Sequence, residues 1–142
     1  DIVKLGVEWI KDVTSPSKLK KETDLNDNGN NSAQIGSSGD YAKIGSSGDS
    51  AQIGSSGDSA KIGSSGDSAQ IESTGNHSVV MAAGNNSIAK AKIGSWITLA
   101  EWDYVDDVWT PICVKTEQVD GERIKADTFY KLIDGEFKEV EE

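Results

Sequence analysis

A nine-residue phrase recurs almost without change from residue 33 to residue 71, and it constrains the fold more than any other feature of the chain. The successive copies read AQIGSSGDY, AKIGSSGDS, AQIGSSGDS and AKIGSSGDS, followed by AQI. A short fixed period is typical of proteins that stack one small structural unit many times. We therefore expect this segment to build an elongated, regular rod.

Each copy of the phrase combines a strand pattern with a turn pattern. Ala-Gln/Lys-Ile alternates apolar and polar side chains with the period of two that marks a half-buried strand. Gly-Ser-Ser-Gly-Asp is turn chemistry, in which the glycines are expected to adopt positive φ angles and the aspartate to bond a backbone amide. The alanines and isoleucines then face inward, and the Gln or Lys between them faces solvent.

The outward residue alternates between Gln and Lys, so it repeats every eighteen residues although the turn repeats every nine. Nine extended residues span about 30 Å, which is too short to go round a core between two sheets about 10 Å apart. The spacing predicts an all-β chain whose main part is a parallel β-solenoid with two nine-residue half-coils per coil. One face carries Gln34, Gln52 and Gln70, and the other carries Lys43 and Lys61.

The nine-residue phase continues after residue 71 while the phrase itself decays. Asn76 and Asn85 take the place of the aspartate, and about seven half-coils fit between residues 31 and 94. The outward positions become apolar at Val79 and Ile88, which indicates that another element covers the last coil.

The residues before the rod, 1–30, are expected to form a capping helix and a linker. An uncovered sheet edge invites aggregation, so the end of a solenoid needs a cap. Helical spacing predicts an apolar stripe over residues 2–13, made of Ile2, Leu5, Trp9, Ile10 and Val13. Ser15-Pro16 ends this helix, and the polar residues 18–31 are expected to be the linker.

Residues 95–142 are expected to form an acidic, Trp-rich antiparallel β-meander of about four strands, following the solenoid of residues 31–94. Three dipeptides between β-rich runs are hairpin signals: Asp106-Asp107, Asp120-Gly121 and Asp134-Gly135. Pro111 indicates an edge strand or the start of a strand. A second core is predicted from Trp96, Trp102, Trp109, Phe129, Tyr130 and Phe137.

The net charge of −10 is distributed unevenly along the chain. Residues 95–142 carry thirteen acidic and five basic side chains, a net charge of −8, whereas residues 1–30 and 31–94 carry −1 each. Direct nucleic-acid binding is disfavoured because it requires a basic stripe. No apolar run is long enough to cross a membrane as a helix, so a membrane partner is not expected. The single cysteine, Cys113, excludes an internal disulfide framework.

Two phrases after the repeat carry a resemblance to a known family. AKAKIGSWITLAEW at residues 89–102 and VDGERIKADTFYKLIDGEFKEV at residues 119–140, together with the SGD repeats, make the chain similar to the C-terminal part of an uncharacterised family in bacteria and their phages. Members carry short SGD-containing tandem repeats, an apolar helix upstream and a Trp-rich β segment downstream. The resemblance implies this architecture, a further N-terminal region and a bacterial or phage source, with a bacterial cytoplasmic or phage-associated location favoured. It implies no activity.

Four aspartates form two rows on the edges of the predicted rod: Asp40 and Asp58 on one edge, Asp49 and Asp67 on the other. Calcium is one hypothesis, since glycine-rich nonapeptide rolls bind it through repeated aspartates. In those rolls the aspartate follows the last glycine by two residues, whereas here it follows directly. A bond from the carboxylate to a backbone amide is the favoured interpretation, because Asn76 and Asn85 would keep that bond without the charge.

The remaining reactive side chains do not form a catalytic pattern. His77 is the only histidine, so neither a zinc site nor a triad with Cys113 is expected. GSSGD lacks the Lys and the helix start of a phosphate-binding loop. We expect no catalytic residues, no metal or other cofactor, and no enzymatic activity in this chain.

The candidates for recognition are aromatic and amide side chains. Trp96, Trp102 and Trp109 are expected in the core, and any of them that is exposed would mark a partner surface. The Gln34, Gln52 and Gln70 row offers a flat face for self-association.

The leading hypothesis is a non-enzymatic structural or interaction protein, in which a rigid solenoid spacer presents the acidic module to a protein partner or a second copy. One alternative is a phage-encoded inhibitor that binds a host defence or nucleic-acid protein through the acidic module. Another is an accessory rod of an enzyme whose catalytic region lies outside this chain.

Overall fold

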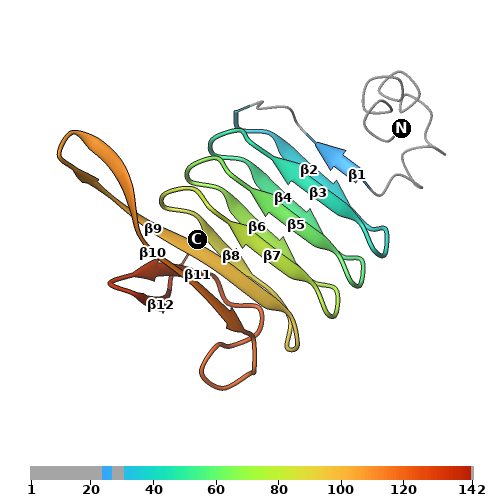
Figure 1. Ribbon diagram of the computed structural model, residues 1–142. Helices are drawn as coiled ribbons and strands as arrows, with labels where there is room; N and C mark the ends of the chain where they lie inside the picture. Colours follow the sequence, from blue (N-terminus) through green and yellow to red (C-terminus); the bar gives the residue numbers. More distant parts are fainter. Residues whose placement is uncertain (1–23, 27–30, 142) are drawn as a thin grey trace.

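The computed structural model describes residues 24–26 and 31–141, which form twelve β-strands in two six-stranded sheets (Figure 1). Sheet A contains, in spatial order, β1 (Asp24–Asn26), β3 (Lys43–Ser46), β5 (Lys61–Ser64), β7 (Val79–Ala82), β9 (Trp96–Val105) and β10 (Val108–Gln118). Sheet B contains β2 (Gln34–Ser37), β4 (Gln52–Ser55), β6 (Gln70–Ser73), β8 (Ile88–Lys90), β11 (Tyr130–Ile133) and β12 (Glu136–Glu139).

The chain alternates between the two sheets from β1 to β9, so each pair of successive strands makes one coil. Gln34 pairs with Gln52 and Gln52 with Gln70, in parallel register, and Lys43 pairs with Lys61 in the other sheet. The predicted parallel β-solenoid with eighteen residues per coil and two half-coils is therefore confirmed. The last coil is one residue shorter, because Val79 pairs with Trp96.

Inward alternation of alanine and isoleucine builds the core of the solenoid, as the repeat predicts. Ala51, Ile53, Ala60 and Ile62 are buried, and the same cluster continues without a break into the C-terminal strands. Its C-terminal members are Ile97, Leu99, Val119, Ile124, Tyr130 and Leu132. The C-terminal region thus completes one continuous core.

The prediction of a second, tryptophan-based core is wrong. Trp96 and Trp109 are exposed and Trp102 is half-buried, whereas Phe129 and Tyr130 are buried and Phe137 packs against the main cluster. The reason is register: β9 continues the parallel order of sheet A after β7, so alternation turns its even-numbered residues outward.

The C-terminal strands are antiparallel, as expected, and they divide into two hairpins that extend different sheets. The β9–β10 hairpin turns at Asp106-Asp107, and the β11–β12 hairpin turns at Asp134-Gly135. Asp120-Gly121 makes a loop instead of a hairpin. Pro111 lies on the edge strand β10 beside a bulge, in agreement with its predicted edge position.

The segment expected to be a linker contains strand β1, which pairs with β3 and so adds a half-coil before residue 31. The predicted capping helix over residues 2–13 lies outside the described residues. Among residues 24–26 and 31–141, no helix is long and apolar enough to cross a membrane.

The turns of the repeat use glycine differently from expectation. Positive φ falls on the residue after each aspartate, such as Ser50 (59°) and Ser59 (58°), and not on the glycines. The second glycine of GSSGD instead permits close stacking. A Cβ at Gly66 would lie 2.1 Å from the carbonyl oxygen of Gly48 in the preceding coil, so no larger residue fits there without a shift of the backbone.

Candidate interaction surfaces

The four repeat aspartates hold adjacent coils together. Oδ1 of Asp40 accepts a hydrogen bond from the backbone N–H of Asp58 at 2.9 Å, and Asp58 accepts one from Asn76 at 2.8 Å. On the other edge Asp49 accepts from Asp67, and Asp67 from Asn85, both at 2.9 Å. The expected bond from the aspartate to a backbone amide is confirmed, and the amide belongs to the next coil, not to the same turn.

A second hydrogen bond closes each of these turns. The N–H of the residue with positive φ donates to the carbonyl oxygen of the aspartate one coil further on, as from Tyr41 to Asp58 at 2.8 Å and from Ser50 to Asp67 at 2.7 Å. Each step between coils is therefore fixed on both edges by two bonds of this kind, in addition to the strand ladders.

The calcium hypothesis for Asp40, Asp49, Asp58 and Asp67 gains no cluster of ligands from this geometry. The described part of the chain contains no group of three or more His, Cys, Asp and Glu side chains that could hold a metal ion. His77 is exposed at a turn, and Cys113 is partly buried against the core.

The predicted row of Gln34, Gln52 and Gln70 lines a shallow groove on the outer face of sheet B. Gln34 Nε2 donates to Gln52 Oε1 at 3.4 Å, and the groove has a volume of about 470 Å³. Gly36 and Gly54 form its floor, and Glu72 and Phe129 also line it. Glu72 is paired with Lys90 at 3.4 Å, and Lys90 lies over the Phe129 ring, so the groove offers amides but no free pair of carboxylates.

The outer face of sheet A changes character along the solenoid. In its early coils the outward positions hold Lys43, Lys61 and glycines, whereas β7 holds Val79 and Met81, and β9 holds Trp96 in register with Val79. Val79 is 42% and Met81 51% exposed. The expectation that another element covers the apolar outward residue Val79 is therefore not met among the described residues.

The same face continues along β9 and β10 into a hairpin that extends past the coils (Figure 1). Tyr104 and Trp109 are paired on it, with ring centroids 5.3 Å apart, and both are 55% exposed. Val114, opposite Ala100, is 63% exposed. We name these six side chains the outer apolar patch: Val79, Met81, Trp96, Tyr104, Trp109 and Val114.

Trp102 has a different role from the other two tryptophans. Its indole N–H donates to the carbonyl oxygen of Ala83 at 2.7 Å, and the side chain is half-buried. It fastens the base of the hairpin to the turn after β7 and so fixes the direction in which the hairpin extends.

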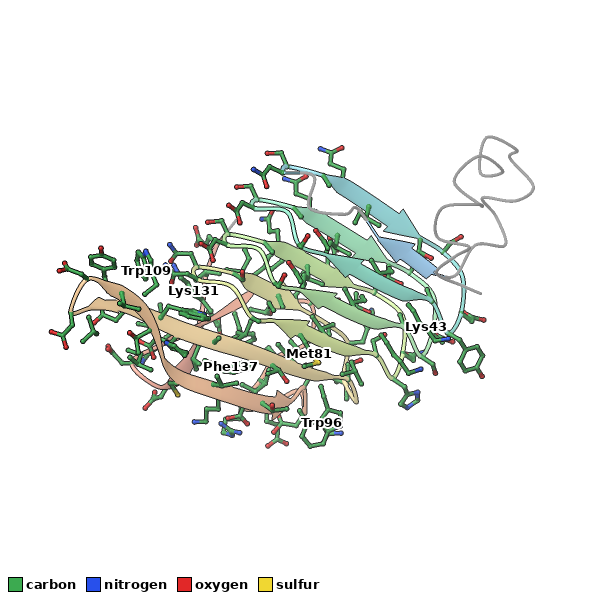
Figure 2. All side chains as sticks on the ribbon, turned by 45° about the horizontal axis from the view of Figure 1, so that its top comes forward. Lys43, Met81, Trp96, Trp109, Lys131 and Phe137 are labelled. Atoms are coloured by element: carbon green, nitrogen blue, oxygen red, sulfur yellow. The ribbon has the colours of Figure 1, made fainter. Side chains whose placement is uncertain are left out.

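Opposite charges flank the outer apolar patch. Lys43 and Lys61 precede it on the same face, and Asp106 and Asp107 form the turn at the tip of the hairpin. Lys43 and Trp109 lie at opposite ends of the structure, with Met81 and Trp96 between them (Figure 2).

Ion pairs and hydrogen bonds stabilise the C-terminal end of the solenoid, which we call the closed end because the strands β9 to β12 cover it. Glu101 accepts hydrogen bonds from the N–H groups of Asp134 and Gly135 at 2.8 and 2.9 Å, which ties β9 to the β11–β12 turn. Buried Glu117 pairs with Arg123, and this hydrogen bond raises the pKa of the Arg123 guanidinium. The two C-terminal hairpins, one in each sheet, are thus connected to each other by side-chain contacts.

The sequence alone identified Trp96, Trp102 and Trp109 as candidates and placed Val79 outward, but it did not point to Met81, Tyr104 or Val114. The alternation in residues 79–81 already placed Met81 outward, two positions after Val79. Tyr104 and Val114 could be placed only once β9 was known to join sheet A.

Comparison of the chain with protein-family models found no match, and comparison with curated proteins and with solved structures found none either.

Proposed function

We propose that this chain is a non-enzymatic interaction protein, in which a rigid β-solenoid spacer presents its acidic C-terminal β-module, and the outer apolar patch, to a protein partner. The observation that carries the proposal is the change of the outward residues on sheet A from Lys and Gly to Val, Met and Trp.

The fold does not require these apolar side chains. Lys61 and Gly63 occupy in β5 the positions that Val79 and Met81 occupy in β7, and both strands form the same parallel ladder. An exposed tryptophan or methionine leaves apolar surface in contact with water, and burying that surface would gain about 25 cal/mol for each Å². A patch with no structural role and an unfavourable hydration is characteristic of a surface that is covered in a complex.

The regular hydrogen bonds between coils support the role of a spacer. Each coil is joined to the next by strand ladders and by the paired turn bonds through the repeat aspartates. Such a stack is expected to be a rigid rod, because each unit contacts only its neighbours and the contacts between repeat units have the same geometry.

Hydroxyl-radical footprinting tests the proposal without knowledge of the partner. Met81, Trp96 and Trp109 would be compared between dilute purified protein and protein inside the cells that produce it naturally. We expect lower labelling in cells for these three, with unchanged labelling of the exposed Tyr41 at a turn of the second coil. Equal labelling of all four side chains in both states would contradict the proposal.

A further inference from the structure

We infer that the partner of the outer apolar patch is a second copy of this chain, bound face to face about a twofold axis. This inference rests on the proposed function and names the partner for the same surface. It follows from the order of charge and apolar surface on the outer face of sheet A.

The face is self-complementary. After β1, in which Asp24 is in register with Lys43, it carries Lys43 and Lys61, continues through Val79, Met81 and Trp96, and ends at the hairpin with its acidic tip. A twofold axis through the middle of such a face places the apolar centres together and the positive end of each copy against the negative end of the other. Isologous dimers require this kind of arrangement, in which one patch serves both subunits.

The arrangement also separates the like charges of the two copies. Residues 96–118, which form the β9–β10 hairpin, carry five acidic side chains and one lysine, a net charge of −4, and residues 31–94 carry only −1. In the antiparallel pair each acidic hairpin lies over the nearly neutral solenoid of the partner, beside its lysines. A parallel arrangement would bring the two acidic hairpins together, and their repulsion would oppose it.

The size of the patch fits a dimer. Three aromatic side chains that are about half exposed present roughly 300 Å², because each carries about 150–250 Å². Val79, Met81 and Val114 add on the order of 150 Å² at a similar exposed fraction. The total of roughly 450 Å² is more than half of the ~800 Å² that each partner contributes to a stable interface. Thr98 and Thr116 lie within the patch, between Met81 and Val114, and their hydroxyl groups are hydrogen-bonded to each other at 2.8 Å.

Charge reversal in two separate variants tests the reciprocal contact. Lys61→Glu and Asp106→Lys should each dimerise about tenfold more weakly than the wild type, by sedimentation equilibrium at low salt. An equimolar mixture of the two should form a heterodimer of wild-type affinity, because one contact is then native and the other has its charges exchanged. Lys138→Glu on β12 of sheet B makes the same change of charge as Lys61→Glu and should leave the dimer unchanged.

The Asp106→Lys variant distinguishes this contact from a general charge effect. It reduces the net negative charge, so simple repulsion between copies predicts tighter self-association, whereas the reciprocal contact predicts weaker self-association. Tighter self-association of Asp106→Lys would overturn the inference. Trp96→Ser should weaken the dimer by at least about tenfold, as expected for an aromatic side chain near the centre of an interface.

Failure of this inference differs from failure of the proposed function. A purified protein that remains monomeric at concentrations of about 1 mM overturns the second copy as partner. If Met81, Trp96 and Trp109 are still protected in cells, a different protein covers the patch and the proposed function stands. If they are labelled equally in both states, both proposals fail.

Discussion

Replacement of Gly66 by alanine tests the stacking of the coils most directly. The ideal Cβ at this position lies 2.1 Å from Gly48 O and 2.5 Å from Gly48 C, and real Cβ contacts almost never fall below 3.0 Å. The two coils must therefore move apart by about 0.9 Å at this turn. Gly63, three residues earlier, has no atom within 4 Å of its ideal Cβ and provides the matched control.

The cost of this movement follows from the bonds that cross the turn. Ser50 donates to Asp67 O at 2.7 Å and Asp67 donates to Asp49 Oδ1 at 2.9 Å. A separation of 0.9 Å lengthens them to about 3.6 and 3.8 Å, beyond hydrogen-bonding distance. Two lost bonds cost about 1 kcal/mol each, and the residual overlap costs about 1–3 kcal/mol. We expect Gly66→Ala to lower the free energy of unfolding by roughly 4 kcal/mol.

Urea denaturation followed by far-ultraviolet circular dichroism measures this difference. Gly63→Ala should be neutral, or more stable by up to about 1 kcal/mol, because alanine restricts the unfolded chain. The slope of the transition should be compared between variants, since a repeat protein can lose its cooperativity when one interface between units weakens. Equal stability of Gly66→Ala and Gly63→Ala would refute the close-approach role of the second glycine.

Three further changes probe the turns and the closed end. Asp58→Ala should destabilise by about 1 kcal/mol in urea denaturation, because the Asn76 amide loses its acceptor, while Asp58→Asn should match the wild type; equal losses would contradict the ladder. Glu101→Ala should accelerate hydrogen exchange at the Gly135 amide, with Glu101→Gln intermediate, and unchanged exchange would contradict this contact. Hydrogen bonds from the Glu122 and Ile124 amides lower the pKa of the Asp120 carboxyl, so its stabilising effect should persist above pH 3.8 and be lost as the pH falls through the folded-state pKa below that value. An NMR titration of the Asp120 carboxyl with a midpoint at or above pH 3.8 would contradict the lowered pKa.

The alternation of Gln and Lys was sufficient to predict the coil, because identical side chains in adjacent coils reveal the register directly. The role of the second glycine was not accessible in the same way. A glycine at a fixed position is compatible both with positive φ and with close approach of another backbone, and only the stacked coils show which applies. The positive φ at Ser50, Ser59 and their equivalents has no strong sequence signal, because Ser, Tyr, His and Asn all occupy this position.

The exposed tryptophans show a similar limit. Trp96 and Trp109 are typical core residues by type, and their alternating pattern is the same whichever face of a strand is buried. Their exposure is decided by the pairing of Trp96 with Val79, which turns Ile97 and Leu99 toward the core. The apolar outward residues at positions 79 and 88 correctly indicated the end of the solenoid where further strands pack. The sequence could not show that β9 leaves Val79 exposed to solvent.

Because the two half-coils are equivalent, the number of nine-residue units determines both the length of the solenoid and the side to which the β9–β10 hairpin points. Each added pair of nine-residue units would lengthen the solenoid by about 4.8 Å and leave every downstream strand on its present sheet. A single added unit would lengthen it by about half as much and transfer every downstream strand to the opposite sheet, because alanine and isoleucine face inward in both half-coils. Even and odd changes in copy number would then point the β9–β10 hairpin to opposite sides of the chain that precedes the repeat. Duplication of one short unit could in this way invert the geometry of an assembly without altering a single contact residue.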